Sequence, residues 1–187
     1  INQGVKVNSG ITLTNNAALG SASGSVTNAG TINSSADNIK GTVSNTGSLN
    51  LSGGTLSKAV SGSGKTTITG NTTNSGGINQ GVTVNSGVTL TNNAALGSDS
   101  GTITNSGTIN TSASNIKGAV TNNNTLNLSG GTLSKAVSGS GTTNITGAVT
   151  SNSAISQAIN VVAAGDLTIN ANNIGGAVTN ACLLYTS

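Results

Sequence analysis

The 187-residue sequence contains no Pro, His, Met, Trp or Phe, and only one Cys and one Tyr. The near absence of aromatic side chains excludes a compact core built around large rings. The absence of His excludes a Ser–His pair for nucleophilic catalysis and any metal cluster that depends on His. Asn, Ser, Thr and Gly are abundant instead. Because these residues have low helix propensity, the composition argues against helices.

Charged residues are also scarce, at 5% of the chain, and six Lys against three Asp give a net charge of +3. Nucleic-acid binding needs a dense basic stripe, usually with aromatic residues for stacking, and the sequence has neither. We therefore expect no nucleic-acid partner and interpret the lysines as groups that keep exposed strands soluble. No apolar run approaches the ~18 residues of a membrane helix, so we expect no membrane insertion by this segment.

The strongest feature of the sequence is internal repetition. The segment INQGVKVNSGITLTNNAALGSASG at residue 1 returns as INQGVTVNSGVTLTNNAALGSDSG at residue 78. About 56 of 77 positions are identical between residues 1–77 and 78–154. A third copy, residues 155–181, is shortened by the loss of an internal block. We predict a single repetitive segment over residues 1–181, cut from a longer protein and lacking native caps.

Triplets that end in glycine divide each long copy into smaller units. In the first copy they end at Gly10, Gly30, Gly47 and Gly64, and the next one ends at Gly87. Their spacing predicts four coils of about 17–23 residues in each copy, each coil being one unit of a stacked repeat. The block missing from the third copy is close to one coil in length. We expect these glycines to supply the positive φ that tight corners require.

The two long copies form an internal record of tolerated substitutions. Fifteen Val, Ile or Leu positions in residues 1–77 are all aliphatic again at the equivalent positions of the second copy. Only two of them change, Ile11 to Val88 and Val26 to Ile103, and both changes keep a β-branched side chain. A set that tolerates only shape-preserving changes is typical of a buried face.

Aliphatic and polar residues alternate with period two within each unit, as in GVKV, ITLT and SLNL. This alternation predicts short, half-buried strands. One-faced strands that recur once in every coil predict an all-β fold, a right-handed parallel β-helix (β-solenoid) with turns stacked ~4.8 Å apart. The alternative is a disordered linker, but disorder usually combines low hydropathy with high charge or Pro.

The three carboxylates form no recurrent pair. Asp37 is replaced by Ser114 in the second copy, Asp99 stands where the first copy has Ala22, and Asp166 is isolated. Enzymes that cleave polysaccharides need paired carboxylates. We therefore predict that this segment is not an enzyme and contains no catalytic, cofactor-binding or metal-binding residues.

Two short motifs suggest chemistry that the surrounding residues do not support. SGSGKT at residues 61–66 lacks the first Gly of a phosphate loop, because Ala59 occupies that position, so we interpret it as a corner. The Thr-x-Thr string at residues 12–14, which reads Thr-Leu-Thr and is repeated at residues 89–91, suggests ice binding, but Thr-Leu-Thr occurs only once in each long copy. Thr also has a high strand propensity, so outward-facing strand positions explain the string.

The last six residues, CLLYTS at 182–187, resemble nothing before them and contain the only Cys and the only Tyr. They correspond to the translation of a transposon end that is used to prepare sequencing libraries. We interpret them as an adapter sequence that is not native, so the Cys says nothing about the redox compartment. The alternative is a genuine short apolar cap strand.

Up to Ala181 the chain resembles the repetitive passenger regions of bacterial autotransporter adhesins and filamentous-haemagglutinin-like exoproteins. The resemblance rests on N-[ST]-G corners followed by [ILV]-x-[ILV], as in NSGITL, NTGSLNL and NSGVTL. It implies an extracellular rod at the bacterial cell surface, tethered in the outer membrane by a barrel or transporter partner outside this segment. The absence of Cys from residues 1–181 fits an oxidising exterior.

We therefore expect a structural or adhesive rod that acts as a spacer or an extended binding surface. Its expected partners are host-surface or matrix glycans and proteins, or further copies of itself, with no cofactor. Two alternatives remain open, the solenoid scaffold of a larger carbohydrate-active enzyme whose catalytic turns lie elsewhere, and a surface-layer or ice-binding repeat protein. Near-identical repeats favour the rod, because a catalytic groove requires turns that differ from one another.

Overall fold

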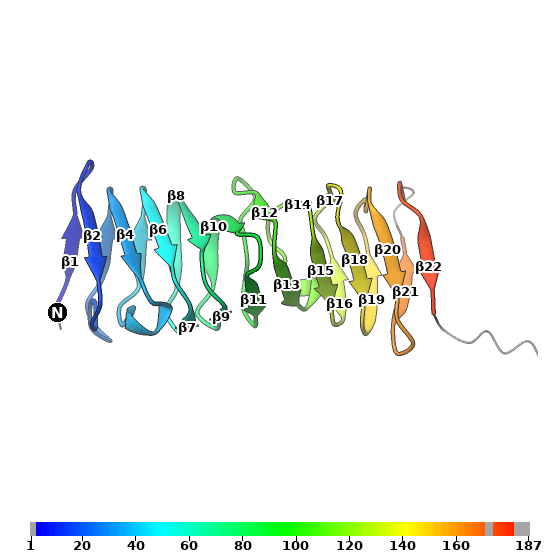
Figure 1. The fold of residues 1–187 in the computed structure, drawn as a ribbon, viewed down its shortest axis with the longest axis horizontal. Coiled ribbons are helices and arrows are strands. Elements are labelled where there is room, and N and C mark those ends of the chain that lie inside the picture. Colours follow the sequence, from blue (N-terminus) through cyan, green and yellow to red (C-terminus); the bar gives the residue numbers. More distant parts are fainter. Residues whose placement is uncertain (1–2, 171–173, 182–187) are drawn as a thin grey trace, which may run out of the picture.

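The computed structural model describes residues 3–170 and 174–181. The chain forms a right-handed parallel β-solenoid of about 10 turns with 3% helix, which confirms the predicted fold. Figure 1 shows the strands following one another along a rod, from β1 at one end to β22 at the other. The predicted adapter at residues 182–187 lies outside the described residues.

Each turn has three sides, so the strands stack in three parallel columns, and paired residues lie 16 to 21 positions apart in the sequence. Column I contains β1 (Val5–Val7), β3 (Val26–Asn28), β5 (Val43–Asn45), the first parts of β8 (Val60–Ile68) and β10 (Ile78–Val84), and then β16 (Gly131–Leu133), β19 (Ala148–Ser151) and β21 (Asp166–Ile169). Column II contains β2 (Thr12–Asn15), β4 (Thr31–Ser34), β6 (Ser48–Leu51), the second parts of β8 and β10, β12 (Ile103–Asn105), β14 (Val120–Asn122) and β17 (Val137–Ser138). Column III contains β7 (Gly54–Leu56), β9 (Thr72–Asn74), β11 (Thr89–Asn92), β13 (Thr108–Thr111), β15 (Thr125–Leu128), β18 (Thr142–Ile145), β20 (Ala158–Val161) and β22 (Val178–Asn180).

Two strands continue around a corner of the rod. β8 pairs with β5 in column I through Val60 and with β6 in column II through Ile68. β10 follows the same path beside it, with a register shift at the corner. The SGSGKT motif lies inside β8 at this corner, where Ser61, Lys65 and Thr66 pair with the strands of the preceding turn, so the motif forms part of a corner.

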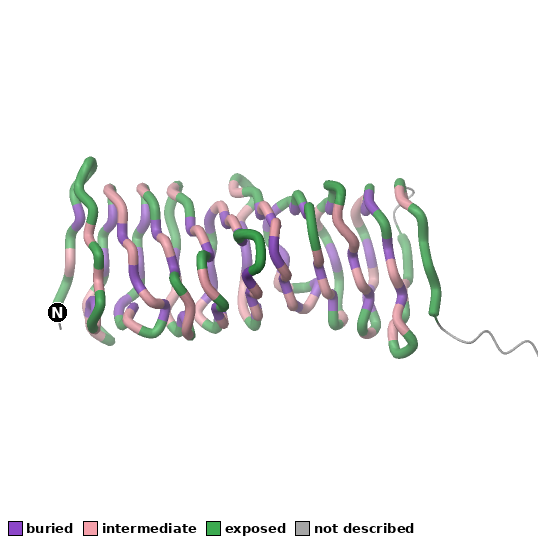
Figure 2. The backbone as a smooth tube through the Cα atoms, viewed as in Figure 1, coloured by how far each residue is buried: buried purple, intermediate pink, exposed green. Residues whose placement is uncertain are grey.

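The core is a set of aliphatic rows that run along the inside of the rod. In column III, for example, Leu90, Ile109 and Leu126 are paired in register and fully buried. Figure 2 shows buried and exposed positions alternating along the strands, as the period-two pattern predicted. Ile11 is an exception at 56% exposed, whereas its counterpart Val88 is 9% exposed. Ile11 lies on the first described turn, so no described turn precedes it and covers its side chain.

Successive long copies are displaced by one side of the rod. Val5 lies in column I, but its counterpart Val82 lies in column II, where it pairs with Ile103. Likewise, Leu13 lies in column II and its counterpart Leu90 lies in column III. Each long copy therefore contributes four and a third turns, where the sequence analysis predicted four coils.

The short third copy is consistent with this count. Ile174 is the counterpart of Ile116, and it stacks on Ile155 in column II. The block that the third copy lacks therefore corresponds to three sides, which make one whole turn. Removing a whole turn leaves the following residues in register with the turns before them.

Most of the corner glycines lack the positive φ that the sequence analysis predicted for them. Gly10 and Gly87 have positive φ, of 76° and 74°. Gly30 and Gly107 do not, but a Cβ atom at either position would lie 2.2 Å from a backbone oxygen of the preceding turn. The prediction of positive φ was thus wrong for Gly30, and also for Gly47 and Gly64, and the close approach of successive turns selects glycine at these positions.

This difference between glycines gives a matched pair of substitutions. Gly107→Ala places a Cβ 2.2 Å from the Val88 carbonyl oxygen and 2.4 Å from that of Asn85. Gly87→Ala meets nothing within 4 Å and costs only its backbone strain, roughly 1–2 kcal/mol. We expect Gly107→Ala to lower the free energy of unfolding by more than Gly87→Ala, as measured by urea denaturation. Equal losses of unfolding free energy in the two variants would show that the corner at Gly107 widens without cost to accept the Cβ atom.

Candidate groove

Two polar grooves lie on the surface, one in each long copy. The groove in the first copy has a volume of about 570 Å³ and that in the second about 690 Å³. All ten lining residues of the first groove have counterparts at the equivalent positions of the second. Nine of these are identical, and the tenth changes from Ser34 to Thr111. The two grooves are therefore the same feature, placed on different sides of the rod by the displacement between copies.

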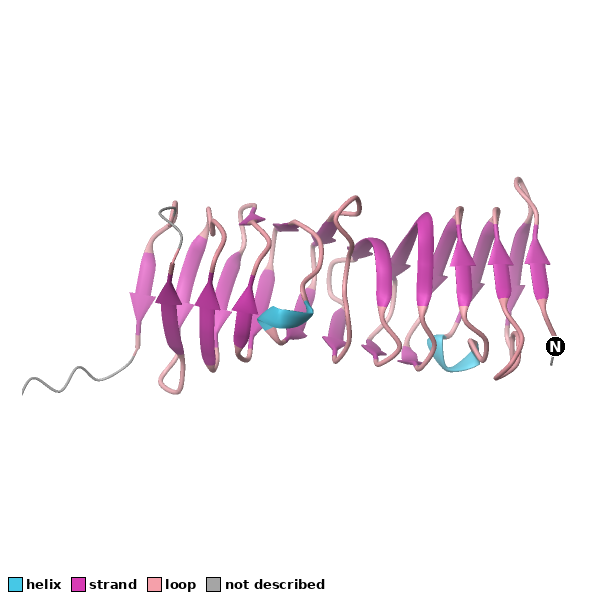
Figure 3. Ribbon diagram, turned by 180° about the vertical axis from the view of Figure 1, so that it is seen from behind, coloured by secondary structure: helices cyan, strands magenta, loops and turns pink. Residues whose placement is uncertain are grey.

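The ends of neighbouring strands and one short helix form the groove of the second copy. It follows the carboxyl ends of β11, β13, β15, β18 and β20, which stack in column III. The 3-10 helix η2 (Ala113–Asn115) forms one wall and is anchored by the fully buried Ala113. Its counterpart in the first copy is η1 (Ala36–Asn38). Figure 3 shows both helices as the only cyan segments among the strands.

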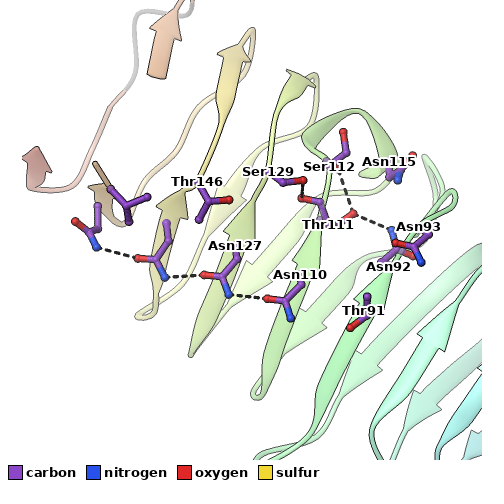
Figure 4. A pocket seen from close by; sticks show the side chains of 13 residues that line it. Thr91, Asn92, Asn93, Asn110, Thr111, Ser112, Asn115, Asn127, Ser129 and Thr146 are labelled. Carbon is purple, nitrogen blue, oxygen red and sulfur yellow. Dashed lines mark hydrogen bonds between the residues drawn. The ribbon is translucent and has the colours of Figure 1, made fainter. Parts of the chain in front are cut away.

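An asparagine ladder runs along the floor of this groove. The Nδ2 atom of Asn127 donates to Oδ1 of Asn110 at 2.6 Å, and Nδ2 of Asn144 donates to Oδ1 of Asn127 at 2.7 Å. Asn160 continues the ladder with a 3.2 Å bond to Asn144. Figure 4 shows these amides in a line, with hydroxyl side chains beside them.

The ladder is longer in the second copy than in the first. In the first groove, Nδ2 of Asn50 donates to Oδ1 of Asn33 at 2.7 Å. The next position in that column is Thr67, whereas the second copy has Asn144 at the equivalent place. The substitution extends the row of amides, because asparagines stacked one turn apart can bond to each other and Thr cannot replace the amide.

Each ladder amide retains part of its hydrogen-bonding capacity. An amide has two N–H donors and two oxygen lone pairs, and the ladder uses one of each. Asn127 is half-buried and keeps one donor and one acceptor for solvent or a ligand. The lining contains no charged residue. The groove is therefore a neutral surface that presents one donor and one acceptor at each turn.

A second polar network lies inside the rod. Asn28 and Asn45 are fully buried, and their side chains are joined by a 2.7 Å hydrogen bond. Gln80 reaches back to Asn45 across Gly62, where a Cβ would lie 2.2 Å from the Asn45 carbonyl oxygen. With its amide oriented to match its neighbours, Gln80 accepts from Nδ2 of Asn45 at 2.8 Å and from Oγ1 of Thr66 at 2.7 Å.

The second copy repeats this internal network. Gln157 spans Gly139 and accepts from Nδ2 of Asn122 at 2.9 Å and from Oγ1 of Thr143 at 2.6 Å. Gln157 and Thr143 are 4% and 0% exposed, so solvent cannot replace these bonds. The two glutamines thus link turns that are not direct neighbours through hydrogen bonds inside the rod.

The three aspartates lie on separate turns. Asp37 belongs to η1, Asp99 follows the buried Leu96, and Asp166 begins β21. About four turns separate each from the next, on the order of 19 Å. The carboxyl pairs of glycoside hydrolases lie within roughly 10 Å of each other. These carboxylates are therefore too far apart to act as such a pair.

Asp37 has a structural partner. One of its carboxylate oxygens accepts from the backbone N–H of Thr55 at 2.9 Å. In the second copy, Oγ of Ser114 accepts from the N–H of Thr132, also at 2.9 Å. Both side chains accept from the backbone N–H of the second residue of the strand on the next turn, which explains why the chain exchanges one residue for the other.

This equivalence predicts how substitutions at Asp37 behave. Asp37→Ser should leave the free energy of unfolding within about 0.5 kcal/mol of the parent, because the hydroxyl accepts the same bond. Asp37→Ala should lose about 1 kcal/mol, because the Thr55 N–H then has only solvent as a partner. Urea denaturation of both variants separates these outcomes. If Asp37→Ser lost as much as Asp37→Ala, the structural role would be wrong.

Asp99 forms an ion pair with Lys135. The hydrogen bond from Lys135, together with its positive charge, holds the pKa of Asp99 below its usual range. The small stabilisation from this pair is present above the usual carboxyl pKa and is lost as the pH falls through the lowered value. Asp99 is highly exposed, and the first copy has Ala22 at the equivalent position, so the pair is a surface addition.

Within residues 3–170 and 174–181, no group of three or more His, Cys, Asp or Glu side chains could hold a metal ion. In the same described residues, no helix is long and apolar enough to cross a membrane.

The sequence analysis named no site residues and did not identify the groove, because the groove depends on which residues stack across turns. The sequence does carry a signal of the groove, because its asparagines recur in Thr-x-Asn strings, in which the Asn lies two positions after a Thr. No protein-family model, curated protein or solved structure matches this chain.

Proposed function

We propose that this chain is part of a structural and adhesive rod of a bacterial cell-surface or secreted protein. It acts as a spacer and an extended binding surface without catalysis. The observation that carries the proposal is the repeated groove, which has an uncharged lining of amides and hydroxyls in both copies, with Val162 added in the second. Such a surface can bind a partner along its length, but its lining has no general acid or base, and no group that could activate a Ser or Thr hydroxyl as a nucleophile.

The resemblance of the N-[ST]-G corners to those of autotransporter and haemagglutinin-like passengers supports an extracellular setting. The mechanical requirements of a spacer also fit this fold. About 10 turns stacked ~4.8 Å apart give a rod on the order of 45 Å long, and further copies extend it without a change in design. A barrel or transporter partner outside this segment would tether the rod.

An adhesion assay tests the proposal. Beads coated with the 187-residue chain are incubated with epithelial cell layers and with immobilised matrix proteins, and beads coated with albumin serve as the control. We expect severalfold greater retention of the coated beads on at least one surface. The same protein incubated with soluble polysaccharides should release no new reducing ends. Release of sugar by the pure chain would refute the non-catalytic role and favour an enzyme scaffold.

A further inference from the structure

The groove of the second copy, which we call the ladder groove, has a regular spacing along its length. It crosses the ends of five strands in column III, and its floor is the row Asn110, Asn127, Asn144 and Asn160. Neighbouring turns of parallel strands lie ~4.8 Å apart, so the groove extends on the order of 19 Å across its five strands, and the four asparagines extend over about 14 Å of it. Each step presents the same pair of groups, one amide donor and one amide acceptor.

A ligand that matches this floor must be extended, repetitive and rich in groups that both donate and accept. The vicinal hydroxyls of a saccharide have this property, and the units of a β-1,4-linked chain repeat at a spacing similar to that of the turns. Hydroxyl side chains beside the ladder, from Ser112, Ser129 and Thr146, can contact the sugar edges. The groove is long enough for about four units.

The charges of the groove restrict the ligand further. None of its lining residues is charged, so no cation is available to pair with a carboxylate or sulfate of an acidic glycan. Moving an unpaired charged group into such a groove removes its hydration without replacing it. An uncharged chain does not carry this cost. The lining also lacks aromatic rings on which a sugar could stack, so affinity depends mainly on hydrogen bonds and is expected to be modest.

We propose that the ladder groove binds a neutral oligosaccharide, with about one sugar unit on each turn of the asparagine ladder. This inference rests on the proposed function and names the chemical class of its partner. The groove in the first copy binds the same class more weakly, because its asparagine ladder has only Asn33 and Asn50 before Thr67. The difference between copies provides an internal control.

Nuclear magnetic resonance of the 187-residue chain tests the proposal. The probes are cellotetraose and chitotetraose, which are neutral, and tetragalacturonate, which has a similar length and is charged. We expect the side-chain amide signals of Asn127 and Asn144 to shift with at least one neutral probe, with a Kd on the order of 1 mM. Tetragalacturonate should bind at least about threefold more weakly. Absence of shifts with both neutral probes, or equal binding of the charged probe, would overturn the proposal.

Substitutions show whether the ladder is responsible. Asn127→Thr introduces the residue that the first-copy column has at Thr67, so the strand should be retained, and we expect about fivefold weaker binding. Asn50→Thr is the matched control in the other groove, and it should change the ladder-groove affinity by less than about twofold. Parent-like binding by Asn127→Thr would refute a role for the ladder. If the saccharides fail to bind while coated beads still adhere, only this inference fails and the adhesive rod remains.

Discussion

Replacing Ile109 with aspartate is expected to unfold the central turns of the rod. Ile109 is fully buried and stacks between Leu90 and Leu126 in column III. A carboxylate there would have neither solvent nor a cation as a partner, so we expect a loss of at least about 4 kcal/mol in the free energy of unfolding. Urea denaturation followed by circular dichroism measures this loss.

Thr108→Asp is the control, because Thr108 is the neighbouring residue and its side chain points outward in the same strand. We expect it to change the free energy of unfolding by about 0.5 kcal/mol or less. Hydrogen exchange should localise the damage in Ile109→Asp, because a solenoid is stabilised mainly by contacts between neighbouring turns. Similar losses in the two variants would contradict the assigned inward and outward faces.

Replacing Gln157 with leucine is expected to have the second largest effect. The change leaves Oγ1 of the buried Thr143 without its acceptor and removes the bonds that the Gln157 amide makes to Asn122 and to the Ser138 carbonyl oxygen. Nδ2 of Asn122 keeps the carbonyl oxygens of Asn124 and Thr142 as acceptors. The unpartnered Thr143 hydroxyl costs roughly 1–3 kcal/mol and the other lost bonds together contribute about 1 kcal/mol, so the total loss should be about 2–4 kcal/mol. The leucine itself has an apolar side chain of similar size, which limits any contribution from a cavity.

A double-substitution cycle separates the network from simple packing. Thr143→Val removes the hydroxyl that Gln157→Leu leaves unpaired, so the double variant should be more stable than the sum of the two single losses predicts. We expect a coupling of at least about 1 kcal/mol from urea denaturation. Strict additivity would mean that the 2.6 Å contact between these side chains contributes nothing to stability.

The alternation of aliphatic and polar residues was sufficient to predict the solenoid. Strings such as GVKV and SLNL indicated strands with one buried face, and their recurrence required that these faces stack. The third side of each turn was harder to recognise. Leu19 and Ile39, which pair across turns, are single aliphatic residues within loops and have no alternating neighbours. They therefore resembled parts of corners. The count of coils in each copy fell one third of a turn short because Gly64 lies between columns I and II, whereas Gly87, the next triplet glycine, lies between columns II and III.

The internal amides were missed because Asn in a corner triplet is usually exposed to solvent. The pattern contained a signal, however, since Asn28 follows the buried Val26 by two positions and Gln80 follows Ile78 by two. Continuing the period-two rule through polar residues would have placed both side chains inside. The ladder groove could not have been found in this way, because its asparagines become neighbours only through the register of stacked turns.

The displacement between copies has a consequence for how such a protein changes length. Each long copy supplies thirteen sides, which make four complete three-sided turns and one additional side. Genetic gain of one copy adds roughly 21 Å to the rod and moves the next groove to the adjacent face. Three successive copies then present grooves in all three directions, whatever the rotation of the rod about its axis. If the grooves bind a ligand as proposed, a longer array gains avidity toward a surface that carries this ligand and needs no fixed orientation.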